Sequence, residues 1–227
     1  MILPPFTGFP PGAQSFLRGL AANNERAWFT EHKAGYERDV LAPMKSLIAE
    51  LVAELQRKKL PFTGDPARAI FRIHRDVRFA RDKAPYKTHA GAVLTRTGQK
   101  WNPGLLYVHV DPTGSFCAAG FYQPEPEPLS CLREAIATEP KTFLAMEKKL
   151  HAKGLELSRD ESMVRLPRGF EHAADNPAAW AIRLRNFTVR RALPAAALRK
   201  PALVQDIVAF AVDARPLLEF GWKAIAV

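Results

Sequence analysis

The stretch Arg72–Lys87 reads RIHRDVRFARDKAPYK and carries six basic residues and two aspartates among aromatic and branched side chains. Apolar and polar residues alternate from Phe71 to Phe79, which predicts a strand with one buried and one polar face. Arg75 falls on the apolar side of this pattern. We therefore expect Arg75 to be buried against a carboxylate or carbonyl groups, because an isolated buried charge is costly. Residues 81–83 predict a turn at the end of the strand.

The polar face of this stretch has the composition of an anion site. Arginine offers a planar fork that binds phosphate or carboxylate at two points, lysine adds a point charge, and tyrosine stacks or donates its hydroxyl. The predicted ligand-binding residues are Arg72, His74, Arg75, Asp76, Arg78, Asp82, Lys83, Tyr86, Lys87 and, from the turn at 167–170, Arg168. The two aspartates leave a second interpretation open, namely an internal salt-bridge network with a structural role.

Length and composition indicate a globular protein, and the net charge indicates the kind of partner. A chain of 227 residues with 47% hydrophobic residues is long enough for a proper core and ordinary for a globular protein. The net charge of +10 favours contact with polyanions such as nucleic acid or nucleotides. We expect a phosphorylated small molecule or a nucleic acid as the partner, and the sequence identifies no protein partner and no cofactor.

The sequence predicts a cytoplasmic protein. The two cysteines, Cys117 and Cys131, fit a reduced, intracellular chain and form no zinc pattern. The N-terminal residues MILPPFTGFPPG have no basic segment followed by an apolar core, so they do not resemble a signal peptide. No apolar run approaches the length of a membrane span, and we expect no contact with a membrane.

Hydrophobic periodicity and turn residues predict an α+β fold. Helices are expected at 13–23, from Asn24 as N-cap to Val40, at 43–55, 129–137, 140–153, 178–184 and 202–220, with a bend near Pro216. Strands are expected at 72–79, 88–95, 105–110, 115–121, 163–166 and 187–193, with no regular structure at 122–128. The simplest assembly is a single domain over residues 1–227, with a central mixed or antiparallel sheet packed by N-terminal and C-terminal helices.

Five long segments resemble an uncharacterised family of bacteria and fungi that is catalogued as a domain of unknown function. They are NNERAWF (23–29), YERDVLAPMKSL (36–47), RIHRDVRFARDKAPYKTH (72–89), GFYQPEPEPLSCLREAI (120–136) and RLPRGF (165–170). The resemblance covers nearly the whole chain. The chain departs from the family pattern at Tyr122, where the family usually has Trp, and at Ala118 or Ala119, where it usually has a small residue such as Gly. The family has no established activity, so the resemblance implies one recurring unit and no mechanism.

Other catalytic chemistry has little support in the sequence. Candidate metal donors are His74, Asp76, Asp82, His89 and His109, but their spacing fits no standard signature and the nearby arginines repel a cation, so no metal site is predicted. The chain has no GxSxG nucleophile motif and no glycine-rich phosphate loop.

Three functions from different classes follow. The first is a binding domain for a phosphate-bearing ligand, a nucleotide or nucleic acid, held by the Arg/Lys cluster. The second is an enzyme acting on such a ligand, with His74, Asp76 and Asp82 as acid–base groups and Tyr86 as an orienting group. The third is a structural or protein-interaction domain in which Arg75, Asp76 and Asp82 are buried and paired with one another.

Overall fold

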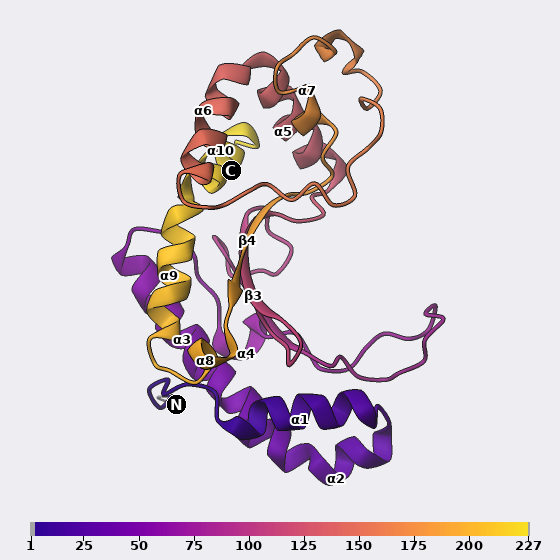
Figure 1. The fold of residues 1–227 in the computed structure, drawn as a ribbon, viewed down its shortest axis with the longest axis vertical. Coiled ribbons are helices and arrows are strands. Elements are labelled where there is room, and N and C mark those ends of the chain that lie inside the picture. Colours follow the sequence, from indigo (N-terminus) through magenta and orange to yellow (C-terminus); the bar gives the residue numbers. More distant parts are fainter. Residues whose placement is uncertain (1–2, 227) are drawn as a thin grey trace. The chain divides into compact units, whose positions relative to one another are not determined.

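The computed structural model describes residues 3–226, so Met1, Ile2 and Val227 of the predicted domain lie outside the described residues. The chain begins with helices that follow one another with little interruption. They are α1 (Pro11–Ala22), α2 (Arg26–Tyr36), the π-helix η1 (Glu37–Leu41), α3 (Ala42–Arg57) and the short α4 (Pro66–Ala69). Helices α1 and α2 lie side by side (Figure 1), and Phe16 of α1 packs against three aromatic rings of α2.

A four-stranded antiparallel sheet follows, in the order β1-β2-β3-β4. Its strands are β1 (Ala90–Thr95), β2 (Leu105–Val110), β3 (Ser115–Phe121) and β4 (Phe187–Leu193). In β2, Leu106, Val108 and Val110 are buried, whereas Leu105, Tyr107 and His109 are half-buried. This alternation places two polar side chains on one face of the strand and the core on the other.

The described residues form two compact units. The first contains the residues up to Lys100, Tyr107–Cys117 and Ala192–Ala209, and the second contains Trp101–Leu106, Ala118–Arg191 and the residues from Phe210 onward. Single-domain organisation over residues 1–227 stays a prediction.

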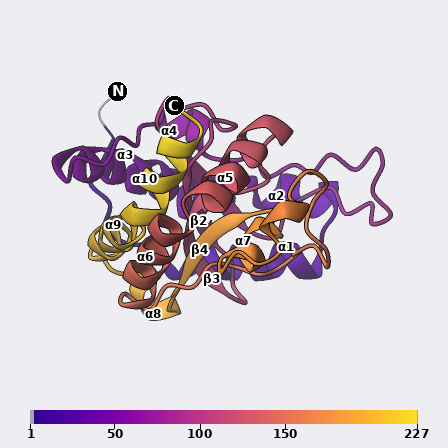
Figure 2. The ribbon, with the colours of Figure 1, turned by 90° about the horizontal axis from the view of Figure 1, so that it is seen from above.

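The second unit gathers helices α5, α6, α7 and α10 around one core (Figure 2). Their bounds are Pro126–Thr138 for α5, Pro140–His151 for α6, Ala179–Ile182 for α7 and Arg215–Ala224 for α10. The remaining helices are the 3-10 helix η2 (Glu171–Ala173), α8 (Ala195–Leu198) and α9 (Leu203–Asp213). Gly221 of α10 lies so close to the Phe121 ring of β3 that a Cβ atom there would be 2.1 Å from it. In the first unit, α3 packs on β1. The predicted α+β class, with N-terminal and C-terminal helices packed on the sheet, is confirmed.

Two predicted strands are wrong. Residues 72–79 form only one isolated bridge, between His74 and Tyr86, because Pro85 accepts a hydrogen bond from the Arg75 N–H but has no N–H to return it. Residues 163–166 make a single backbone hydrogen bond, from Met163 to Arg183, so they do not pair as a strand, and Val164 is exposed.

Three helix boundaries also differ from the prediction. Asn24 does not cap α2, whose N-cap is Glu25. Helix α5 begins at Pro126, inside the stretch predicted to be irregular, because first-turn N–H groups have no partner within the helix and proline loses nothing there. The predicted C-terminal helix is divided between α9 and α10, and Pro216 lies in the first turn of α10.

Candidate functional site

Residues 70–92 form an irregular two-stranded ribbon, here called the basic hairpin. Antiparallel bridges join Ile70 to Ala92 and His74 to Tyr86, and backbone hydrogen bonds connect the arms between them. It is the extended purple loop that leads into β1 in Figure 1. The period-two exposure pattern holds from residue 71 to residue 78: Phe71, Arg75 and Val77 are half-buried, Ile73 is buried, and the residues between them are exposed. It ends at Phe79, which is exposed.

The base of the basic hairpin is fixed to α2 by Asn24 and Phe29. The Asn24 side-chain amide donates to the Tyr86 carbonyl at 2.9 Å, and its oxygen accepts from the Tyr86 N–H at 3.0 Å. The Tyr86 ring is buried, stacks on Phe29 at 4.3 Å and also contacts the His74 ring at 5.1 Å. The Tyr86 ring therefore serves as packing at the base, and its role as a ligand-stacking group stays a prediction.

Ion pairs connect the residues near the tip of the basic hairpin. Arg75 lies 2.6 Å from Asp82, and Arg78 holds Asp76 with two hydrogen bonds of 2.7 and 3.0 Å. Lys83 donates to the carbonyls of Val77 and Arg78. The Arg75 side chain is 30% exposed, so it does find a carboxylate but is not the buried residue that the sequence pattern predicts.

These ion pairs lower the pKa values of Asp76 and Asp82. Hydrogen bonds from the Arg78 side chain and backbone lower the pKa of Asp76 to about 2. The hydrogen bond from Arg75, followed by the one from the Ala84 N–H, lowers the pKa of Asp82. Both carboxylates are therefore ionised near neutral pH, and a carboxylate with so low a pKa is a poor general base.

A second group of cations lies around the Phe71 ring at the base. The ammonium groups of Lys87 and Lys100 lie 5.2 and 4.5 Å from the ring centroid, and Lys100 donates to the Ile70 carbonyl at 2.8 Å. Burial lowers the pKa of both lysines, and the charge of Arg72 lowers that of Lys87 further. Among residues 3–226, no carboxylate lies within ion-pair distance of Lys87, Lys100 or Arg72.

At the tip, one large aromatic side chain lies in solvent. Phe79 is 95% exposed, and the Arg78 guanidinium lies 5.9 Å from the centroid of its ring. Arg81, two positions further along, is exposed. An apolar ring of this size usually loses free energy by staying in water, so a binding role at this position is a physical expectation.

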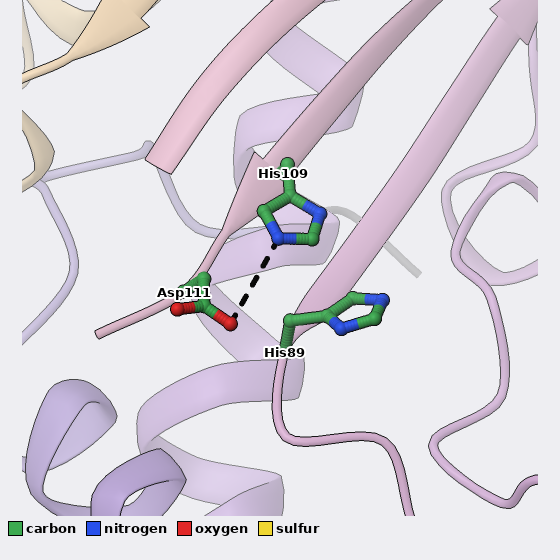
Figure 3. Close-up of side chains that lie close together, drawn as sticks. All are labelled: His89, His109 and Asp111. Carbon is green, nitrogen blue, oxygen red and sulfur yellow. Dashed lines mark ion pairs between the residues drawn. The ribbon is translucent and has the colours of Figure 1, made fainter. Parts of the chain in front are cut away.

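A cluster of two histidines and an aspartate occupies the half-buried face of β2 (Figure 3). His89 immediately precedes β1, His109 lies in β2, and Asp111 immediately follows β2. One donor atom from each residue lies within 4.8 Å of the others, and His109 Nε2 is 3.9 Å from Asp111 Oδ2. The His109 Nδ1 atom lies 2.9 Å from the Tyr107 hydroxyl.

The surroundings keep both imidazoles neutral near neutral pH. Burial, followed by the charge of the neighbouring His89, lowers the pKa of His109 to about 4, although Asp111 opposes both effects. Burial also lowers the pKa of His89. The two rings lie 4.3 Å apart, and Phe116 of β3 stacks on the other side of His109 at 4.6 Å.

Sequence reasoning found only part of this cluster. His89 and His109 were candidate metal donors in a set for which the sequence predicted no metal site, and the structure groups them with Asp111 and not with His74, Asp76 or Asp82. The missed residues Tyr107 and Asp111 carry a readable signal, because YVHVD alternates along β2 and puts Tyr107, His109 and Asp111 on one face. No comparable signal marks Lys100. Arg168 is exposed in the second unit, and its membership of the site stays a prediction.

Comparison with known proteins identifies the family. A sequence profile of a conserved hypothetical protein family, DUF2461, matches residues 13–220. The chain belongs to the DUF2461 family. The DUF2461 match includes the basic hairpin and the His89–His109–Asp111 cluster, and confirms the resemblance to an uncharacterised family. No curated protein and no solved structure matches the chain. Within the part of the chain that the structure describes, no helix has the length and apolar character needed to cross a membrane.

Proposed function

We propose that this DUF2461 protein binds single-stranded nucleic acid through the basic hairpin. The observation that carries the proposal is Phe79, a fully exposed ring at the tip of a ribbon whose arms are lined with cations. Proteins that bind single strands combine a positive surface that follows the backbone with aromatic side chains on which bases stack. The basic hairpin supplies both elements.

The charge distribution supports contact with phosphates at the base of the hairpin. Arg72, Lys87 and Lys100 are not neutralised by carboxylates within the described residues, in contrast to Arg75 and Arg78. Besides burial, the charge of Lys87 lowers the pKa of Lys100, so the two ammonium groups near the Phe71 ring repel one another, and a phosphate bound beside them would relieve this repulsion. The overall charge of +10 acts in the same direction by attracting polyanions from a distance.

The two alternative functions receive less support from the geometry. The ion pairs of a structural network are present, but they are exposed, and exposed pairs contribute little to stability. For an enzyme, Asp76 and Asp82 are each paired with an arginine, and neither forms a hydrogen bond or an ion pair with His74. His74 packs instead against Phe29 and Tyr86.

Fluorescence anisotropy with a labelled single strand of about 20 nucleotides, repeated over a range of salt concentrations, tests the proposal. The affinity should fall linearly with salt on logarithmic axes, with a slope of about 0.7 for each phosphate contact. The variant Lys87→Ala/Lys100→Ala should weaken binding and reduce this slope. Phe79→Ala should lose about 1–3 kcal/mol of binding free energy, the usual value of one stacked base, and leave the slope unchanged.

A charge-matched variant controls for the general effect of a basic protein. Lys148→Ala/Lys149→Ala removes the same two charges from an exposed part of α6, and we expect it to bind almost as wild type does. Equal losses in the two double variants would show a diffuse basic surface and would overturn the proposal. Unchanged binding by Phe79→Ala would do the same, as would a free nucleoside triphosphate that binds as tightly as the single strand.

A further inference from the structure

We propose that His89, His109 and Asp111 bind a divalent first-row transition-metal ion, with zinc as the leading candidate, and leave coordination positions open for another ligand. The inference is independent of the nucleic-acid proposal. It starts from the donor atoms themselves, which converge from the beginning of β1 and the end of β2 (Figure 3).

Two of the three side chains are held so that one donor atom is left for an ion. With the proton on Nδ1, His109 donates to the Tyr107 hydroxyl oxygen 2.9 Å away, and this tautomer leaves the Nε2 lone pair available to an ion. The backbone N–H and the hydroxyl of Thr113 both donate to Oδ1 of Asp111, at 2.7 and 2.5 Å, which leaves Oδ2 available. These two available atoms lie 3.9 Å apart. Partners of this kind, which fix the orientation of ligating side chains, accompany metal ligands in most protein sites.

The spacing suits a metal ion after a small adjustment. Two donors that each lie about 2.1 Å from a tetrahedral zinc ion are about 3.4 Å apart. The observed distance between Nε2 of His109 and Oδ2 of Asp111 is 3.9 Å, and a small rotation of either side chain would shorten it to this value. His89 supplies a donor within 4.8 Å of the other two.

The donor types select the class of metal. Calcium and magnesium take oxygen ligands, so two imidazoles disfavour them. Two histidines and one carboxylate suit zinc with an open fourth position, and the same set with more open positions suits iron(II). The cluster contains no thiolate, so it differs from the closed zinc sites that only stabilise folds.

A second explanation for the cluster is aromatic packing alone, since Phe116, His109 and His89 form a stack. Packing accounts for the rings, and the hydrogen bonds from Thr113 account for Asp111 as the first residue of the turn between β2 and β3. Neither explanation requires Oδ2 of Asp111 to lie 3.9 Å from Nε2 of His109. His151 provides a contrast within the chain. It also lies near a carboxylate, Glu147 at 3.8 Å, but it has no third donor beside it.

The test uses the whole 227-residue chain, without a tag, after treatment with a chelator. Titration with Zn²⁺ in a calorimeter should show one equivalent of saturable binding, and Co²⁺ should give the visible absorption of a low-coordinate site. His109→Ala and Asp111→Asn should each lose more affinity than Tyr107→Phe, for which we expect a loss of about 10–100-fold, as for other residues that orient a metal ligand.

Controls separate a metal site from a folding defect. His151→Ala should retain the one equivalent, and wild type should melt at a higher temperature with Zn²⁺ than without it, because the ion binds only the folded chain. If His109→Ala does not fold, His89→Gln replaces it, since His89 lies outside the regular strands. Zinc binding that is absent from wild type, or that persists unchanged in the folded His89, His109 and Asp111 variants, would overturn the proposal.

Discussion

Arginine side chains occupy two opposite environments in this molecule. In the basic hairpin, Arg75 and Arg78 lie in or near solvent, and each holds an aspartate at 2.6–2.7 Å. In the second unit, Arg133 of α5 is only 9% exposed and has no carboxylate partner within the described residues. Its Nη2 donates to the Leu184 carbonyl at 2.9 Å and contacts the Met163 sulfur at 3.5 Å.

The difference shows that a short distance between opposite charges is a poor guide to stability. Water screens the hairpin pairs, so their contribution to the free energy of unfolding is small. Arg133 makes one good hydrogen bond, but that bond is buried, and removal of the donor leaves a buried carbonyl without a partner. The unpaired arginine is therefore expected to matter more for stability than the paired ones.

The largest effect should come from Arg133→Ala. The substitution deletes the donor to Leu184 and opens a cavity under α5, and we expect a loss of about 2–4 kcal/mol in the free energy of unfolding. Urea denaturation measures it. Arg133→Met keeps most of the volume without the buried charge and should cost less than Arg133→Ala. A change in unfolding free energy of under about 0.5 kcal/mol for Arg133→Ala is in the range of ordinary surface substitutions. It would contradict the expected difference between the buried Arg133 and the exposed arginines of the hairpin.

An intermediate effect is expected at the base of the basic hairpin. Asn24→Ala removes both hydrogen bonds to the Tyr86 backbone and should cost about 1–2 kcal/mol, with faster hydrogen exchange at the Tyr86 N–H. Asn23→Ala is the matched control, because Asn23 makes a single side-chain bond to Gly19 in an exposed position and should cost less. Equal losses of unfolding free energy in Asn24→Ala and Asn23→Ala would show that the two Asn24 hydrogen bonds do not anchor the hairpin.

The smallest effect should follow Arg78→Ala. The pKa of Asp76 should rise from about 2 toward the ordinary value of about 3.9, which NMR of the carboxyl carbon can follow during an acid titration. A carboxyl group with a lowered pKa in the folded state stabilises that state above its unfolded pKa, and the contribution is lost as the pH falls from about 4 to about 2. Lys83→Ala leaves this pair intact and is the control. An Asp76 pKa still near 2 in Arg78→Ala would contradict the pairing.

Local signals predicted most of the regular elements of the fold. The alternation in 105–110, 115–121 and 187–193 gave β2, β3 and β4 with their observed limits, and the proline at 140 marked the start of α6. Alternation of apolar and polar residues also predicted a strand at 72–79, and there it was wrong. Alternation shows which side chains a strand would bury, but it does not show whether a partner strand is available for hydrogen bonding. Pro85 on the opposite arm removes the donor that continued pairing would need.

The candidate sites depended more on tertiary structure than the elements did. The basic composition of the hairpin was visible in the sequence, but its division into paired and unpaired cations was not, because Lys100 reaches Phe71 from a different segment. His89 and Asp111 likewise meet only because β1 and β2 are neighbours in the sheet. Periodicity can place a residue on a face, whereas strand order decides what lies opposite it.

The double contact between Asn24 and Tyr86 has a consequence for the sequence at that position. A carboxamide has one N–H donor and one carbonyl acceptor side by side, as a peptide unit does. Asn24 therefore offers Tyr86 the same two hydrogen bonds that a residue of a neighbouring strand would offer. Aspartate would offer two acceptors to a site that needs one donor, and glutamine would place the same groups one methylene too far away. A single side chain thus sets the register of a backbone segment, and no other standard residue has both the chemistry and the length to replace it.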